Sequence, residues 1–169
     1  MIKLHELFDT TDIPEIQHYK DGSYDIYEFS IKSMDDRIIE YEVQFRNIGA
    51  RELGLIDGVN KNERGADISF LAKIKGSKKQ SSFDQIGIAP SIRVFSIIAR
   101  IIQGVIKQNN YAGFRFDANK SEGSRKKLYD RFAELIEEKT NYDWFKEDER
   151  ESGEYLSYMF LRRDISDKI

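Results

Sequence analysis

The fold is decided by residues 89–117, which read APSIRVFSIIARIIQGVIKQNNYAGFRFD. Up to about residue 108, apolar side chains recur at steps of three and four, which predicts a helix covered on most sides. Asn109 and Asn110 end this helix, and Phe114 and Phe116 then alternate with polar residues as in a short strand. Because a strand also precedes the helix, this order predicts a crossover between two strands that can pair in parallel.

Before this crossover the hydrophobic period is two. Residues 39–46 alternate strictly between apolar and polar side chains, and residues 27–32 do so ahead of a turn at 33–36. The two segments predict an antiparallel hairpin with one packed face. A third strand is expected at 66–75, and a strand fragment at 53–56.

Beyond the crossover, residues 121–139 predict a second helix, and residues 141–146 and 154–162 predict a closing hairpin. A capped helical turn is expected at 12–16. The resulting fold class is α+β, with a central sheet that is mainly antiparallel and flanked by helices. The 169 residues fit one domain, 1–169.

Composition excludes several kinds of chemistry. The chain has no cysteine, which rules out disulfides, thiolate catalysis and iron–sulfur clusters. Its two histidines, His5 and His18, both lie near the start, so no metal site is expected. The net charge of −3 gives no strong nucleic-acid signal. Neither a signal peptide nor a run long enough to span a membrane is recognised, so a cytoplasmic protein is expected.

Three short sequence motifs between residues 87 and 129 form a recognisable combination. Gly87-Ile88-Ala89 stands at the start of the apolar helix, where free N–H groups can hold a phosphate. Asn119 follows the short strand at 114–117, and Leu128-Tyr129 lies in the second helix. Together these residues resemble the core of the GNAT superfamily, the acyl-CoA-dependent N-acyltransferases.

The resemblance implies a GNAT-like sheet in which one parallel strand pair splays. A bound thioester would lie between the strands at 66–75 and 114–117. It implies acetyl-CoA as the acyl donor, an amine of a metabolite or protein as the acceptor, and no metal. The implied cofactor-binding residues are Gly87, Ile88, Ala89, Ser91, Arg93, Asn119 and Ser124.

Tyr129 and Glu42 are the candidate catalytic residues. Tyr129 matches the tyrosine that protonates the departing CoA thiolate in many members of the superfamily. A general base is needed because an amine with a pKa of about 10 is protonated at neutral pH. Of the strand carboxylates Asp67, Glu40 and Glu42, the candidate is Glu42 on the strand at 39–46. Both residues also fit structural roles, as a tyrosine packed on the sheet and a carboxylate on a solvated strand face.

Two departures from the superfamily pattern keep a second function open. Asp84 stands where the superfamily has Gln or Arg, and its charge repels phosphate. Pro90 removes one N–H donor from the helix start. The alternative is a catalytically inactive GNAT-like protein that binds a protein or nucleic-acid partner. Residues 93–96, taken with the later motifs, are similar to small GNAT-like proteins often encoded by bacteriophages, which implies a phage or mobile-element protein in the host cytoplasm.

Overall fold

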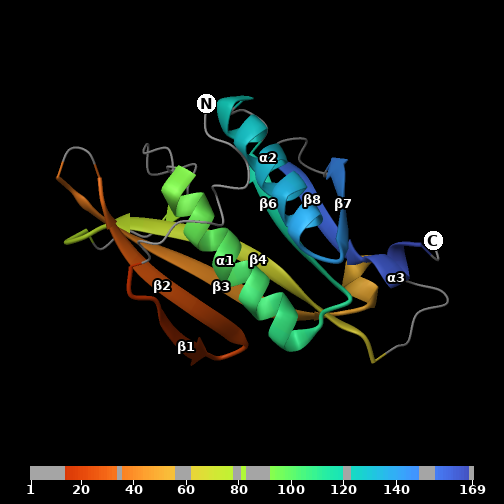
Figure 1. Ribbon diagram of the computed structural model, residues 1–169. Coiled ribbons are helices and arrows are strands. Elements are labelled where there is room, and N and C mark those ends of the chain that lie inside the picture. Colours follow the sequence, from red (N-terminus) through yellow and green to blue (C-terminus); the bar gives the residue numbers. More distant parts are fainter. Residues whose placement is uncertain are drawn as a thin grey trace. The chain divides into compact units, whose positions relative to one another are not determined.

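The computed structural model describes residues 14–33, 36–55, 62–77, 81–82, 92–119, 123–148 and 155–167. These residues form eight strands, one short 3₁₀ helix (η2) and three α-helices (Figure 1). In chain order they are β1 (Gln17–Asp21), β2 (Tyr24–Lys32), β3 (Ile38–Gly49), η2 (Arg51–Leu53), β4 (Arg64–Ile74), β5 (Ser81–Ser82), α1 (Ile92–Asn109), β6 (Gly113–Asn119), α2 (Gly123–Lys139), β7 (Tyr142–Asp148), β8 (Tyr155–Arg162) and α3 (Arg163–Ser166).

The strands hydrogen-bond in the order β1-β2-β3-β4-β6-β8-β7, and β5 pairs with β4. The pairs β1–β2, β2–β3, β4–β5, β6–β8 and β7–β8 are antiparallel, whereas β4–β6 is parallel. Helix α1 lies between β4 and β6 in the chain, as a parallel connection requires. The expected α+β class, with a mostly antiparallel sheet and one parallel pair, is therefore confirmed.

The chain forms two compact units. Unit 1 comprises Met1–Arg46 and Ser69–Ile101, and unit 2 comprises Asn47–Ile68 and Ile102–Ile169. Strands β3 and β4 and helix α1 each begin in one unit and end in the other. None of the described helices is long and apolar enough to cross a membrane.

Unit 1 contains the predicted β2–β3 hairpin, in continuous register from Tyr24↔Arg46 to Lys32↔Ile38. Alternate residues of β3 are buried, so the strict apolar–polar alternation of the sequence marks a packed face and a polar face. Buried side chains of β4 and of the first half of α1 add to the core of this unit. They include Phe70, Ala72, Val94, Phe95, Ile97 and Ile98.

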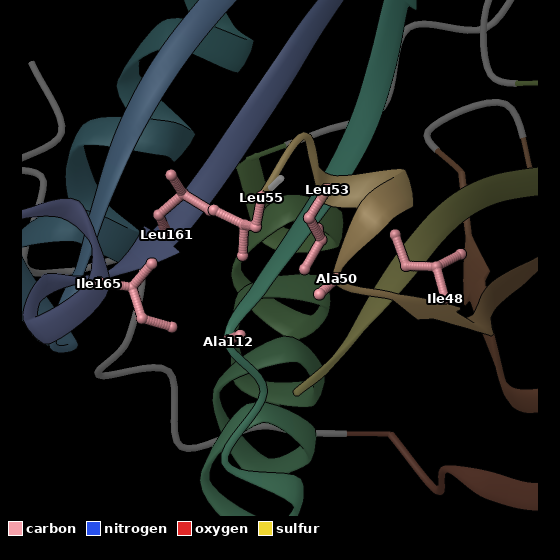
Figure 2. Packing of buried hydrophobic residues seen from close by; sticks show 7 residues of the cluster. All are labelled: Ile48, Ala50, Leu53, Leu55, Ala112, Leu161 and Ile165. Atoms are coloured by element: carbon pink, nitrogen blue, oxygen red, sulfur yellow. The ribbon is translucent and has the colours of Figure 1, made fainter. Parts of the chain in front are cut away.

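In unit 2, aromatic rings of β6 and β8 stack on one another, and Tyr129 and Phe132 of α2 pack their rings at a tilt against Phe116 of β6. Phe114 and Phe160 stack with ring centroids 4.4 Å apart, and Phe116 and Tyr158 stack at 5.0 Å. A separate apolar cluster joins the η2 segment to β8 and α3 (Figure 2). Its members are Ile48, Ala50, Leu53, Leu55, Ala112, Leu161 and Ile165.

Three local features differ from the sequence expectations. Strand β1 was not expected, because all five of its residues are exposed and give no alternation. The strand fragment expected at 53–56 is wrong where the chain is described: Leu53 N donates to Ala50 O, and Gly54 at φ 78° closes the 3₁₀ helix η2. Residues 14–16 form no helical turn, and 12–13 lie outside the described residues.

Candidate functional site

Tyr129 lies on the buried side of α2, where its side chain is only 3% exposed. The helical spacing that buries it also buries Phe132, Ala133 and Ile136. Its ring lies 5.8 Å from that of Phe116 on β6, measured between centroids. The candidate proton donor is therefore packed against the strand that forms the parallel pair with β4.

A second tyrosine, Tyr158 on β8, lies beside Tyr129 with ring centroids 6.1 Å apart. The Tyr158 hydroxyl donates a hydrogen bond to Asp130 Oδ1 at 2.5 Å. Burial raises the pKa of Tyr158 well above its usual value, and the bond to Asp130 and the charge of Asp130 raise it further. Tyr158 therefore keeps its proton over the whole physiological range.

The parallel pair is short. Three residue pairs join β4 to β6, namely Gly65↔Gly113, Ala66↔Phe114 and Asp67↔Arg115. β4 then continues to Ile74, and β6 continues along β8 to Asn119. At the last pair, Arg115 Nε lies 3.6 Å from Asp67 Oδ1, and Arg115 Nη1 donates to Glu52 O at 3.1 Å.

Glu42, the candidate base, lies on β3 in unit 1, half-buried. Its Oε2 accepts a hydrogen bond from Gln44 Nε2 at 2.5 Å, and its Oε1 lies 3.5 Å from the Tyr19 hydroxyl. Tyr19 donates mainly to Glu28 Oε1, at 2.6 Å, and this bond raises the pKa of Tyr19 above its usual value. Glu42 is thus part of a hydrogen-bonded polar face rather than an isolated carboxylate.

The same face borders a hollow of about 740 Å³ within unit 1. Glu28 and Glu42 stand directly opposite each other across β2 and β3. Lys73 Nζ lies 3.5 Å from Glu40 Oε2 and is the only cation among the described lining residues. Carboxylates therefore outnumber cations, and the hollow suits a cationic group. Its lining residues are Pro14, Glu15, Gln17, Glu28, Phe29, Ser30, Glu40, Tyr41, Glu42 and Lys73.

A smaller hollow of about 380 Å³ lies in unit 2, where α1 and α2 end. Lys107 and Lys139 line it, each in the last turn of its helix. Cations are favoured there by the partial negative charge of a helix C-terminus. Thr140 Oγ1 donates to Ile136 O at 2.6 Å, which satisfies one terminal carbonyl. The two lysines and Thr140 in this hollow are therefore explained by the stabilisation of two helix C-termini.

The residues expected to hold the cofactor fall mostly outside the described part of the chain. Gly87, Ile88, Ala89 and Ser91 are not described. Arg93 is exposed in the first turn of α1, and that turn contains no acidic residue. Two further members of the expected set are placed by backbone alone: Asn119 ends β6, and Ser124 lies in the first turn of α2.

The expected residues are distributed over both units. Glu42 and Arg93 belong to unit 1, and Tyr129 belongs to unit 2. Among the described residues, no group of three His, Asp or Glu side chains is placed to hold a metal ion. The Asp130–Tyr158 bond could not be predicted from a sequence motif, because its partners are 28 residues apart.

Comparison with solved structures finds similarity to spermidine N-acetyltransferases. A chimera of SpeG from Vibrio cholerae and hSSAT aligns with a TM-score of 0.42 at 10% identity, covering 85% of this chain and 69% of that one. A single-residue mutant of Vibrio cholerae SpeG aligns with a TM-score of 0.39 at 10% identity, covering 85% and 68%. An uncharacterized Bacillus halodurans protein aligns with a TM-score of 0.36 at 9% identity, covering 93% and 95%.

No protein-family model and no curated protein matches the sequence.

Proposed function

We propose that the protein is an N-acyltransferase that moves an acyl group from acetyl-CoA or a related thioester to an amine. The observation that carries the proposal is the parallel pair β4–β6, joined through α1 in a mostly antiparallel sheet. The sequence motifs resembling the GNAT core fall at this crossover and on α2, and Tyr129 packs against β6. We further propose that the protein acts in the cytoplasm, that of the host if the chain is phage-encoded.

Acyl-CoA would supply the activated acyl group as a thioester. The residues proposed to hold it are Gly87–Ser91 and Arg93, with Asn119 and Ser124. Among the described residues, the exposed guanidinium of Arg93 and the acid-free first turn of α1 fit a pyrophosphate. That fit supports an anionic donor, and the carboxylate-lined hollow of unit 1 supports a cationic acceptor.

In the proposed reaction, the amine nitrogen forms a bond to the thioester carbonyl carbon and the carbon–sulfur bond breaks. The Tyr129 hydroxyl gives its proton to the departing sulfur, and Glu42 accepts the proton released by the amine. Because the chain has no cysteine, no cysteine acyl-enzyme can form. The acyl group would therefore pass directly from sulfur to nitrogen.

A second candidate function is binding without catalysis, as in an inactive GNAT-like protein of a phage or mobile element. The 3% exposure of Tyr129 favours it, because a tyrosine so enclosed by Phe116 and Tyr158 also fits a structural role. In that case the partner would be a protein or a nucleic acid, and acyl-CoA would neither bind nor react.

Thiol release separates the two functions. Since the protein has no cysteine, a thiol reagent detects only the free CoA produced from acetyl-CoA and a panel of polyamines, lysine peptides and aminoglycosides. We expect turnover with at least one amine. We also expect Tyr129→Phe to lower kcat by about 100-fold or more, the usual contribution of a general acid.

Tyr142→Phe is the matched control, because it removes another buried phenol of unit 2 and should leave kcat unchanged. Acetyl-CoA at about a hundred times its Kd should also add about 2.7 kcal/mol to the free energy of unfolding. No stabilisation by any acyl-CoA, together with no thiol release, would reject the acyltransferase in favour of the binding protein.

A further inference from the structure

The hydrogen bond between Tyr158 and Asp130 ties β8 to α2 inside the aromatic core of unit 2. The Tyr158 side chain is fully buried, and its ring stacks on Phe116 and on Trp144, with centroids 5.0 and 5.8 Å apart. Its hydroxyl reaches Asp130 Oδ1 at 2.5 Å. Stacking on both neighbours fixes the orientation of the Tyr158 ring. The hydrogen bond from its hydroxyl therefore holds the Asp130 side chain at a fixed position beside β8.

Asp130 directly follows Tyr129 in α2. Whatever fixes the Asp130 side chain therefore also fixes the turn of helix that carries Tyr129. The Tyr129 ring packs against Phe116 and against Tyr158, and these two rings stack on each other. Tyr129 is thus held through its helix by the Asp130–Tyr158 bond and through its ring by Tyr158 and Phe116.

The bond also separates the roles of the two phenols. Burial and the bond to Asp130 raise the pKa of Tyr158, and the nearby Tyr129 contributes a smaller part of the same shift. A phenol that donates to a carboxylate has its proton engaged and cannot give it to another group.

We propose that Asp130 and Tyr158 are a pair of positioning residues for Tyr129. Their hydrogen bond fixes the rotation of α2 and with it the place of the Tyr129 ring against Phe116 and Tyr158. The inference rests on the proposed acyl transfer, in which Tyr129 is the proton donor.

The kinetic test compares variants that remove or keep the bond. Tyr158→Phe keeps the stacked ring, and Asp130→Ala keeps the helix; each should lower kcat about tenfold or more while KM for acetyl-CoA stays within about twofold. Asp130→Asn keeps an acceptor oxygen and should retain most of kcat. The double variant Tyr158→Phe/Asp130→Ala should be no slower than either single variant, because each substitution already removes the same hydrogen bond. An unchanged kcat in Tyr158→Phe, or a raised KM alone, would overturn the proposal.

A measurement without turnover separates this inference from the proposed function. In protein labelled with ¹³C at tyrosine Cζ, the Tyr129 signal is assigned with Tyr129→Phe. We expect it to shift in Tyr158→Phe and Asp130→Ala, and to stay in place in Asp130→Asn and in the control Tyr142→Phe. If the wild type transfers no acyl group, the proposed function fails while this shift still supports the positioning pair. A Tyr129 signal unmoved in Tyr158→Phe would overturn it, whatever the activity.

Discussion

Tyr142, the first residue of β7, carries a buried phenol with one defined partner. It is 2% exposed, and its hydroxyl donates to Tyr111 O at 2.5 Å. Burial raises the pKa of Tyr142 to about 12. The folded protein therefore holds this proton more tightly than the unfolded chain, in which tyrosine has a pKa of about 10. The resulting stability is fully present below pH 10 and is lost as the pH rises to about 12.

We predict that Tyr142→Phe changes both the level and the pH dependence of stability. Below pH 10 it should lower the free energy of unfolding by about 1–2 kcal/mol, because Tyr111 O loses its donor. Between about pH 10 and 12, the difference from wild type should shrink, by no more than about 1.4 kcal/mol per pH unit. Urea unfolding of the wild type and of Tyr142→Phe at several pH values measures this difference in the free energy of unfolding. A difference that stays constant up to pH 12 would contradict the assigned cause.

At the scale of the element, the parallel pair begins where two glycines allow backbones to approach. A Cβ on Gly113 would lie 2.5 Å from Phe160 O and 2.9 Å from Leu161 Cδ2. A Cβ on Gly65 would lie 2.5 Å from Gly113 O. Because backbone atoms cannot move aside as a flexible side chain can, any larger residue at these positions pushes the strands apart.

We predict opposite effects from two Gly→Ala changes in unit 2. Gly113→Ala should lower the free energy of unfolding by about 1–3 kcal/mol through overpacking. Gly104→Ala, at an exposed position of α1 with no atom within 4 Å of the new Cβ, should raise it by about 0.5–1 kcal/mol through helix propensity. Urea unfolding of both variants measures the two changes in the free energy of unfolding. Equal effects of the same sign would show that close approach does not govern the start of the pair.

Elements whose period reflects burial could be predicted from the sequence. Strand β3 alternates between buried and half-buried residues over most of its length, and α1 is buried on most of its faces, so both were found within a few residues of their bounds. Strand β1 could not be found, because a fully exposed edge strand carries no apolar pattern. The η2 helix was missed because Leu53 and Leu55 are buried by a turn at Gly54 rather than by strand alternation.

The candidate site could be predicted only in part, for a related reason. Local motifs select Tyr129 and the helix start near Arg93, since each involves residues adjacent in the chain. Hydrogen bonds between residues that are distant in the chain produce no local motif. Arg162 illustrates this: its guanidinium bonds Asp164, Glu63 and Asn110 O, which lie 2, 99 and 52 residues away in the chain. The Asp130–Tyr158 bond is of the same kind.

At the scale of the whole molecule, the chain passes from one unit to the other inside regular elements rather than in loops. The crossings fall within β3, β4 and α1. A strand or helix forms cooperatively along its length, because each hydrogen bond depends on its neighbours. Loss of one half of such an element therefore weakens the other half, which belongs to the other unit.

We therefore predict that the two units unfold in a single transition. The one tryptophan, Trp144, lies in unit 2 and stacks on Tyr158, so its fluorescence follows unit 2 alone. Far-ultraviolet circular dichroism follows the strands and helices of both units. In urea the two signals should share one midpoint, and Gly113→Ala should lower both midpoints equally. A dichroism signal that persists after the fluorescence change is complete would show that unit 1 is stable on its own, so that the shared elements do not couple the units.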